Sequence, residues 1–292
     1  MSATTTALFD FSPAQIAELA STDAARTLAE DVGAGDLTAA LVPAAQRARA
    51  RLLVREAAVL CGVPWVEAVL RQVDPGLRLD WRRGEGQRCE ANEVLLEIEG
   101  SARSLLTAER SALNFLQLLS AVATKTATYV QAVEGTRARI VDTRKTLPGL
   151  RLAQKYAVRV GGGLNHRIGL HDAVLIKENH IATAGGVSAV LRAAGRVAHQ
   201  ARFVEIEVET LAQLEEALAA GASMVLLDNM DLPMLREAVR LNAGRAVLEI
   251  SGGVTLERVR ELAQTGVDRI SVGALTKDVR AIDLSLRMEM LA

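Results

Sequence analysis

The feature that most constrains the fold is a repeated alternation of short apolar stretches with amphipathic stretches, which begins near residue 139. Stretches of strand length are each followed by a stretch with helical spacing, so the sequence predicts consecutive βα units and hence parallel strands. The predicted strands are Arg139–Asp142, Ala173–Lys177, Phe203–Val208, Met224–Asp228, Ala246–Ile250 and Arg269–Val272. Six such units favour an irregular α/β barrel, with an open doubly wound sheet as the alternative.

The residues before this region follow a different pattern. Between about residues 47 and 100, strand-like stretches are separated by turns that contain Gly or Pro-Gly. Two helical stretches precede them, around Pro13–Leu19 and Asp23–Glu30. This order predicts a small N-terminal α/β domain with an antiparallel sheet. A long helical run without Pro or Gly then extends over about Ser104–Val133, before the barrel begins.

Composition and charge exclude several classes of protein. The formal net charge of −1 argues against a general electrostatic surface for nucleic acid or membrane, and the aromatic content of 3% argues against base stacking. No stretch is as long and apolar as a transmembrane helix, and Met1–Asp10 lacks the regions of a signal peptide. Cys61 and Cys89 lack metal-type spacing, which favours buried thiols in a reducing compartment. We therefore expect a cytoplasmic protein that binds neither nucleic acid nor membrane.

A polar or glycine-rich group lies at the end of each predicted strand. In a barrel the carboxyl ends of all strands meet on one face, and active sites are found there. These groups are Asp142-Thr143-Arg144-Lys145, Lys177, Glu207, Asp228, Ser251-Gly252-Gly253 and Val272-Gly273-Ala274. The last two lie between a strand and a helix, where glycine lets the backbone approach a ligand and the helix offers unpaired N–H groups. The sequence therefore predicts an active site with a phosphate subsite.

Positive charge is concentrated between Arg139 and Lys177, where eight Lys or Arg residues accompany two Asp residues. Arg151, Lys155 and Arg159 recur at every fourth position, so we interpret them as a solvated helix face. The basic residues at a strand end or in short polar loops are Arg144, Lys145, Arg167 and Lys177. Arginine suits a bidentate grip on carboxylates and lysine acts as a point charge for phosphate, so these four predict an anionic substrate.

Three further side chains are candidates for chemistry. His166 lies in Gly-Gly-Gly-Leu-Asn-His-Arg, which predicts a flexible loop that closes over a ligand; a histidine bonded to backbone is the alternative. Glu207 and Asp228 are carboxylates at the ends of buried strands, a costly position unless they are paired or bind a metal. We favour Mg²⁺ held by one or two of these carboxylates and by substrate phosphate oxygens. The alternative is that the carboxylates neutralise Lys145 and Lys177, which we expect in the absence of substrate.

Eight short motifs occur along the chain in a fixed order: EDVGAGDLT at Glu30–Thr38, TAERSALN at Thr107–Asn114, DTRKT at Asp142–Thr146, NHRIGL at Asn165–Leu170, IKENH at Ile176–His180, LLDN at Leu226–Asn229, SGG and VGALT. In this order they closely resemble the motifs of the quinolinate phosphoribosyltransferases, the carboxylating nicotinate-nucleotide pyrophosphorylases of NAD biosynthesis. Together they span nearly the whole chain. The resemblance implies phosphoribosyl transfer from phosphoribosyl pyrophosphate to quinolinate with decarboxylation, which gives nicotinate mononucleotide, pyrophosphate and CO₂.

The resemblance also implies an architecture and an assembly. An N-terminal open α/β sandwich would occupy residues 1–116 and an irregular α/β barrel residues 117–277. A C-terminal helix over residues 278–292 would pack back on the sandwich. The assembly implied is a homodimer, or a hexamer built from dimers, in which the neighbouring subunit completes each active site.

Family roles transfer to the matching positions of this sequence. Arg110, in TAER, would cross the dimer interface to a quinolinate carboxylate. The residues expected to line the quinolinate pocket are Thr143, Arg144, His166 and Arg167. Lys145 and Lys177 would contact phosphoribosyl pyrophosphate and the reacting pair, while Glu207 and Asp228 would hold Mg²⁺ or the ribose hydroxyls; we expect these four to be catalytic. The residues expected to cradle the phosphate are Ser251, Gly252, Gly253, Val272, Gly273 and Ala274.

Two other interpretations stand beside this one. A relative that takes another small carboxylate, such as nicotinate, or a molybdenum-transport-associated relative would need fewer cations than this region offers. A non-catalytic phosphate-binding barrel would have no use for metal-binding carboxylates, and Glu207 with Asp228 argues against it. A panel of small carboxylates tested as substrates separates the three.

Overall fold

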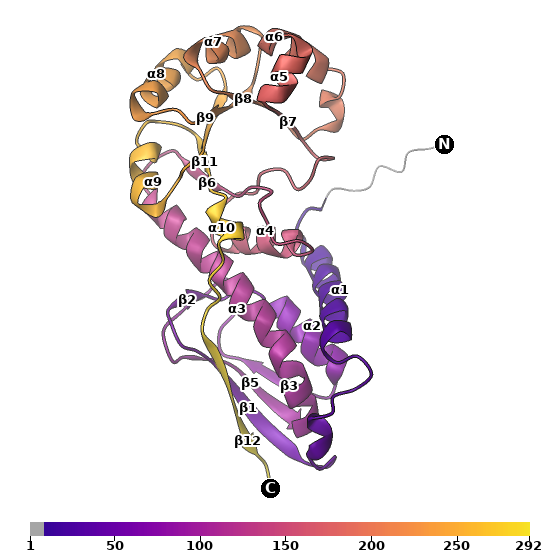
Figure 1. The fold of residues 1–292 in the computed structure, drawn as a ribbon. Coiled ribbons are helices and arrows are strands. Elements are labelled where there is room, and N and C mark those ends of the chain that lie inside the picture. Colours follow the sequence, from indigo (N-terminus) through magenta and orange to yellow (C-terminus); the bar gives the residue numbers. More distant parts are fainter. Residues whose placement is uncertain (1–8) are drawn as a thin grey trace, which may run out of the picture. The chain divides into compact units, whose positions relative to one another are not determined.

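The computed structural model describes residues 9–292, which divide into two compact units (Figure 1). The first unit comprises the chain up to Lys125, Arg159–Gly161 and Asp278–Ala292, and the second comprises Thr126–Val158 and Gly162–Lys277. The first eight residues of Met1–Asp10, the stretch that lacks signal-peptide features, lie outside the described residues. Within residues 9–292 no helix is long and apolar enough to cross a membrane.

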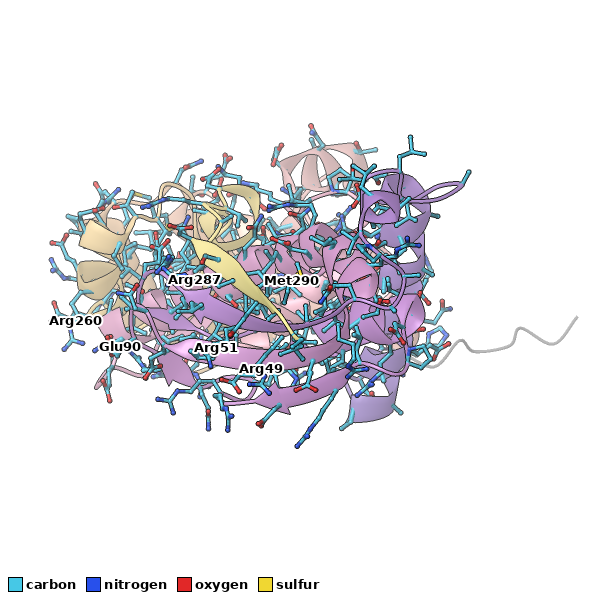
Figure 2. The ribbon with its side chains drawn as sticks, turned by 90° about the horizontal axis from the view of Figure 1, so that it is seen from below. Arg49, Arg51, Glu90, Arg260, Arg287 and Met290 are labelled. Atoms are coloured by element: carbon cyan, nitrogen blue, oxygen red, sulfur yellow. The ribbon has the colours of Figure 1, made fainter. Side chains whose placement is uncertain are left out.

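The first unit is built on an antiparallel sheet with the strand order β12-β1-β5-β3. The strands are β1 (Arg47–Val54), β3 (Arg78–Trp81), β5 (Val94–Ser101) and β12 (Leu284–Met290). In β1 polar and apolar residues alternate, so Ala48, Ala50 and Leu52 are buried while Arg49 and Arg51 lie on the opposite, exposed face (Figure 2). The alternation therefore gives the sheet one core face and one solvated face.

Helices complete the core of this unit. They are α1 (Pro13–Asp31), α2 (Val63–Val73) and α3 (Ala102–Ala132), with a 3₁₀ turn, η1 (Ala39–Leu41), before β1. Apolar side chains of α2 and α3 pack against the core face of the sheet, and α1 packs on α2. A separate two-stranded sheet pairs β2 (Ala58–Val59) with β4 (Arg88–Cys89). Cys61 and Cys89 are buried free thiols, as predicted.

The prediction of a C-terminal helix over residues 278–292 was wrong. This segment contains β12, which pairs antiparallel with β1 and sets Leu286 opposite Leu52. Apolar residues occupy every second position from Leu284 to Met290, which is the period of a strand rather than of a helix. Pairing with β12 also satisfies backbone groups along one side of β1 that an edge strand leaves unpaired.

The second unit contains a parallel sheet with the strand order β6-β11-β10-β9-β8-β7. The strands are β6 (Arg139–Val141), β7 (Val174–Ile176), β8 (Val204–Val208), β9 (Met224–Asp228), β10 (Val247–Ser251) and β11 (Arg269–Ser271). The helices are α4 (Arg151–Val160), α5 (Glu178–Ala184), α6 (Val187–Ala194), α7 (Leu211–Ala219), α8 (Leu232–Asn242), α9 (Leu256–Ala263) and α10 (Ala274–Lys277), with a 3₁₀ turn, η2 (Ala198–Gln200). Every strand pair in this sheet is parallel, which confirms the predicted βα units.

The sheet curves into a ring with helices on its outside, so the second unit is the predicted α/β barrel (Figure 1). Neighbours along the chain lie side by side from β7 to β11, and β11 then pairs with β6. Beyond β6 the ring continues through Leu164, which forms a parallel bridge with Val141 and donates its N–H to Ile140. Within residues 9–292 β6 and β7 are not paired, so the barrel is irregular, and the segment leading to His166 lies beside this interruption.

Candidate active site

A cavity of about 190 Å³ lies at the carboxyl ends of the barrel strands. The predicted residues that line it are Thr143, Arg144, Lys145, His166, Arg167, Lys177, Glu207 and Ser251. Glu249 and Ser271, which the sequence analysis did not single out, line it too. Glu249 and Ser251 are two positions apart on β10 and therefore project from the same face of the strand. The topology thus gathers side chains from several strands and from the loop before β7.

The turn after β10 depends on glycine. Asp228, at the end of β9, lies opposite Ser251, and Gly252 and Gly253 follow with φ values of 90° and 57°. L-residues rarely adopt these angles. A Cβ atom at Gly252 would lie 2.9 Å from Oδ1 of Asn229 and 3.2 Å from Oδ1 of Asp228. Any larger residue at Gly252 would therefore disturb the Asp228 carboxylate.

The turn after β11 approaches Lys145 in a similar way. Val272 is buried and donates its N–H to the carbonyl of Val141. A Cβ atom at Gly273 would lie 3.0 Å from Cδ of Lys145, and Ala274 begins α10. The small residue at position 273 thus leaves room for the lysine side chain. Arg110 lies exposed on α3 and does not belong to the residues that line the cavity.

Lys177, which follows β7, lies beside Glu207 of β8. Its Nζ atom is 3.4 Å from Oε2 of Glu207. Burial raises the pKa of Glu207, the Lys177 charge opposes this shift, and the Asp228 charge adds to it. Two neighbouring carboxylates beside a lysine have the chemistry to hold a hard divalent cation together with phosphate oxygens.

Two guanidinium groups, those of Arg144 and Arg167, line the cavity. Arg167 is 8% exposed, and its Nη1 donates to the carbonyl of Ala173 at 3.4 Å. Burial lowers the pKa of Arg167, and the positive charge of Arg144 lowers it further. Nε of Arg144 is buried, and the described part of the chain offers it no acceptor. A bound carboxylate would supply that acceptor and offset the two like charges.

Asp142, directly after β6, is a buried hydrogen-bonding centre. Its carboxylate accepts from Nζ of Lys155 at 2.5 Å, from Nδ2 of Asn165 at 2.7 Å and from the N–H of His166 at 2.8 Å. Lys155 is 0% exposed, so the prediction that it lies on a solvated helix face was wrong. The two charges are buried as a pair because either one alone would be strongly unfavourable there.

The loop that carries His166 is anchored at both ends. Asp142 holds its start, and Asp172, which is buried, accepts the N–H groups of Ile168 and Gly169, each at 2.8 Å. His166 itself is buried. The structure therefore shows a packed loop instead of the flexible lid that its glycines predict.

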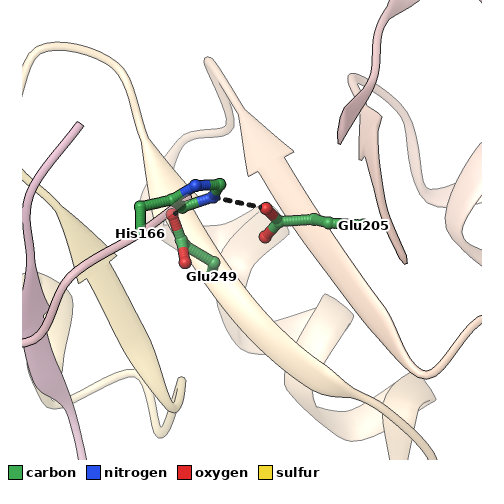
Figure 3. Close-up of side chains that lie close together, drawn as sticks. All are labelled: His166, Glu205 and Glu249. Atoms are coloured by element: carbon green, nitrogen blue, oxygen red, sulfur yellow. Dashed lines mark hydrogen bonds and ion pairs between the residues drawn. The ribbon is translucent and has the colours of Figure 1, made fainter. Parts of the chain in front are cut away.

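The His166 ring contacts a cluster of buried charged side chains that the motifs of the sequence did not predict (Figure 3). Nε2 of His166 lies 2.7 Å from Oε2 of Glu205 and 3.8 Å from Oε1 of Glu249, whose Oε2 lies 2.8 Å from Nε of Arg269. Burial raises the pKa of each glutamate to about 7 and lowers the pKa of His166. The ligand atoms of His166, Glu205 and Glu249 lie within 4.8 Å of one another, so the cluster has donor atoms that could hold a metal ion.

Known proteins are similar to this chain in sequence and fold over nearly its whole length. Models of the N-terminal and C-terminal domains of quinolinate phosphoribosyl transferase match residues 36–120 and 122–287. A nicotinate-nucleotide pyrophosphorylase [carboxylating] of Mycobacterium leprae is 46% identical over 268 residues, 89% of this chain and 94% of the relative. A mitochondrial quinolinate phosphoribosyltransferase [decarboxylating] of Nicotiana tabacum is 40% identical over 282 residues, 90% of this chain and 80% of the relative.

A solved structure agrees with these relatives. The nicotinate-nucleotide pyrophosphorylase from Francisella tularensis superposes with a TM-score of 0.90 at 43% sequence identity, and covers 94% of this chain and 97% of its own. The tobacco relative is named as mitochondrial, so membership of the family does not by itself define a compartment. Both domains, and the order in which they occur, match one group of enzymes. The chain belongs to the quinolinate phosphoribosyltransferase family.

Proposed function

We propose that this chain transfers the phosphoribosyl group of phosphoribosyl pyrophosphate to quinolinate and decarboxylates the product to nicotinate mononucleotide, as a step of NAD biosynthesis. The observation that carries the proposal is the cavity itself. It combines two guanidinium groups, one with a buried unpaired donor, with the ion pair between Lys177, which follows β7, and Glu207 of β8. A dicarboxylate and a polyphosphate sugar need these two kinds of surface.

The arginine side of the cavity is the proposed quinolinate subsite. Arg144 and Arg167 would each bind a carboxylate of the pyridine. The Thr143 hydroxyl accepts the N–H of Lys145 at 3.0 Å and would thereby orient the turn that carries Arg144. His166 lies behind this surface with its ring nitrogens turned to protein groups. A monocarboxylate such as nicotinate would leave one guanidinium without a partner, which favours quinolinate.

The lysine side is the proposed subsite for phosphoribosyl pyrophosphate. Lys145 and Lys177 would contact the phosphates. The backbone expected to cradle the ribose phosphate belongs to Ser251, Gly252, Gly253, Val272, Gly273 and Ala274. Left-handed glycine turns allow N–H groups to approach an anion closely, and Gly252 has this backbone conformation.

The residues at this side also fit Mg²⁺. Glu207 and Asp228 would hold the ion, because carboxylate oxygens combined with substrate phosphate oxygens are the ligands that Mg²⁺ usually has in proteins. The space beside Oδ1 of Asp228, which a Cβ atom at Gly252 would fill, supports this assignment. When bound, Mg²⁺ would neutralise phosphate oxygens and favour the departure of pyrophosphate.

The chain's own groups assist the transfer step, and decarboxylation follows from the pyridinium that this step forms. The lone pair of the pyridine nitrogen forms a bond to the anomeric carbon as the bond to pyrophosphate breaks, and pyrophosphate takes that electron pair. Carboxylates at Glu207 and Asp228 stabilise the positive charge that develops on the ribose, and Lys145 and Lys177 stabilise the leaving group. The bond to the carboxylate beside the new pyridinium then breaks, CO₂ leaves, and the ring carbon takes up a proton.

The test uses purified protein with phosphoribosyl pyrophosphate, Mg²⁺ and either quinolinate or nicotinate. We expect nicotinate mononucleotide and CO₂ in equal amounts from quinolinate, and no product from nicotinate. Product from nicotinate alone would reject the dicarboxylate assignment. Absence of product from both substrates, with phosphoribosyl pyrophosphate still bound in calorimetry, would leave a binding protein rather than an enzyme.

Replacement of Arg144 by Ala tests the quinolinate subsite. Loss of a buried charge-assisted pair should raise the KM for quinolinate about 100-fold. The KM for phosphoribosyl pyrophosphate should stay within about three-fold, because Lys145 and Lys177 are intact. Steady-state kinetics with each substrate varied in turn gives both values. Equal losses for the two substrates would contradict the proposed role.

Replacement of Gly252 by Ala tests the phosphate turn. The new methyl group is forced toward Asp228 and Asn229, so the KM for phosphoribosyl pyrophosphate should rise about ten-fold through misplacement of the turn. Gly244 is a matched control, because its φ of 77° is also left-handed but no atom beyond its own chain neighbours lies within 4 Å of the position that a Cβ atom would take there. Gly244→Ala should lower stability without changing that KM. Similar kinetics for the two variants would refute the contact argument.

Arg110 is proposed to act in the neighbouring subunit of a homodimer, or of a hexamer built from dimers, in the cytoplasm. Its exposed position on α3 is consistent with a contact in trans. Arg110→Ala and Lys177→Ala proteins should each be inactive, and refolding them together should restore about a quarter of wild-type activity by random pairing. Mixtures that stay inactive, although sedimentation shows mixed oligomers, would place Arg110 outside the active site.

A further inference from the structure

The reaction proposed above makes no use of the two buried carboxyl groups behind His166. Glu205 and Glu249 are both 0% exposed, and they lie on β8 and β10 next to the cavity (Figure 3). Negative charge close to an anion subsite weakens anion binding, so we expect these carboxyl groups to have another role. Two purposes fit the atoms present: the cluster binds a metal ion through His166, or it holds the imidazole by hydrogen bonds.

The hydrogen bond at the other ring nitrogen decides between these two. The backbone N–H of Arg167 donates to Nδ1 of His166 at 2.7 Å, so Nδ1 carries no hydrogen. A neutral imidazole has one N–H group, which must then be at Nε2. Burial lowers the pKa of His166 and so favours this neutral form. A nitrogen that carries hydrogen has no lone pair for a metal, and Nε2 instead points its hydrogen at Oε2 of Glu205, 2.7 Å away.

The other groups around the ring are consistent with hydrogen bonding. Glu249 is 3.8 Å from Nε2 and is paired with Arg269, so Glu205 is the nearer acceptor. The ring of Phe203 contacts the imidazole edge to face, with centroids 5.2 Å apart. The His166 ring is therefore fixed by one acceptor, one donor and one aromatic contact.

We propose that Glu205 is a positioning residue for the reaction and that the cluster is not a metal site. Glu205 accepts the Nε2 hydrogen, and this hydrogen bond acts together with the one from the Arg167 N–H to Nδ1 to fix the tautomer of His166. Nδ1 is then the acceptor that holds the backbone of Arg167, whose guanidinium faces the quinolinate subsite. The catalytic part of this inference rests on the proposed function, whereas the tautomer does not depend on it.

The tautomer is measured directly by NMR on protein labelled with ¹⁵N-histidine. The chain has four histidines, and the signal of His166 is assigned from its loss in His166→Gln. We expect the Nε2–H form in the wild type and in Glu205→Gln, because the glutamine carbonyl still accepts. In Glu205→Leu the signal should show both tautomers or broaden. An Nδ1–H form in the wild type would overturn the proposal, as would one equivalent of tightly bound Zn²⁺ or Mn²⁺ that Glu205→Leu loses.

Kinetics separates a positioning role from a structural one. Glu205→Leu should raise the KM for quinolinate about ten-fold, the value of one buried hydrogen bond, and leave the KM for phosphoribosyl pyrophosphate within about two-fold. Glu205→Gln should have a KM for quinolinate close to that of the wild type, because the glutamine carbonyl still accepts the Nε2 hydrogen. Asp23→Leu is the matched control, since Asp23 is also a buried acid that accepts from a ring N–H, that of Trp65, but lies in the first unit. It should destabilise the protein and change neither KM.

The failure of this inference differs from the failure of the proposed function. Wild-type protein that binds quinolinate in calorimetry but forms no product would reject the activity and leave the tautomer and binding measurements valid. Turnover by the wild type, with equal quinolinate KM values in Glu205→Leu and Asp23→Leu, would reject the positioning role alone.

Discussion

Replacement of Lys155 by Met is expected to lower the free energy of unfolding by about 3–5 kcal/mol, the typical effect of removing one partner of a buried ion pair. Met keeps the length of the side chain, so little packing is lost. The Asp142 carboxylate, however, stays buried with only neutral donors, from Asn165 and His166. Burial already raises the pKa of Asp142, and the Lys155 charge is the largest effect that opposes this shift. Equilibrium unfolding in urea measures the difference.

Arg159→Met is the matched control for this prediction. Arg159 lies one turn further along α4, is exposed, and has its guanidinium 5.0 Å from the centre of the Phe11 ring. Its loss should change the unfolding free energy by about 1 kcal/mol or less. The double variant Asp142→Asn/Lys155→Met should be more stable than Lys155→Met alone, because it leaves no unpaired buried charge. Equal unfolding midpoints for Lys155→Met and Arg159→Met would contradict the ion-pair argument.

The barrel was predictable from sequence because each of its strands is a local pattern. Short apolar stretches that alternate with helical spacing leave few topologies open, and parallel pairing then brings all strand ends to one face. The sequence could therefore anticipate that Lys177, Glu207 and Ser251 lie together around one cavity. Their exact distances depend on strand register and rotamers, which no local pattern encodes.

The errors occur where a residue's partner is distant in the chain. The alternation from Leu284 to Met290 is a strand signal, but it decides the structure only because β1, more than two hundred residues earlier, offers it an edge. Lys155 has the spacing of a solvated helix face, yet its environment is decided by a carboxylate on another element. Propensity and periodicity describe the helix and do not describe what that helix packs against.

The buried charges behind His166 did have a sequence signal. The strands VEIEV, VLEIS and RIS place Glu205, Glu249 and Arg269 at positions that alternate with apolar residues, so these side chains project to the inside of the barrel. A charge on the inward face of a covered strand requires a partner. The need for partners was therefore predictable, whereas the pairing of Glu205 with His166 depends on how the loop between β6 and β7 packs.

Replacement of Glu207 by Gln is expected to have the largest effect on activity, a fall in kcat of about 100-fold to 1000-fold, comparable to the loss of one preorganised electrostatic group. Glutamine has the same shape but supplies no charge to the developing cation of the ribose and binds Mg²⁺ more weakly. Burial raises the pKa of Glu207, so a neutral group at this position should fold at least as well as the carboxylate. The thermal midpoint should therefore stay unchanged or rise while kcat falls.

Glu209→Gln is the control, because it makes the same substitution at an exposed position two residues further along the chain. It should leave kcat within about two-fold of the wild type, as surface changes away from a site usually do. A Mg²⁺ titration of each variant adds a second test, since the Mg²⁺ concentration for half-maximal rate should rise only in Glu207→Gln. The same kcat and the same Mg²⁺ dependence in Glu207→Gln and Glu209→Gln would contradict this role. The only function of the Glu207 carboxylate would then be to neutralise Lys177, and it would not stabilise the reacting ribose.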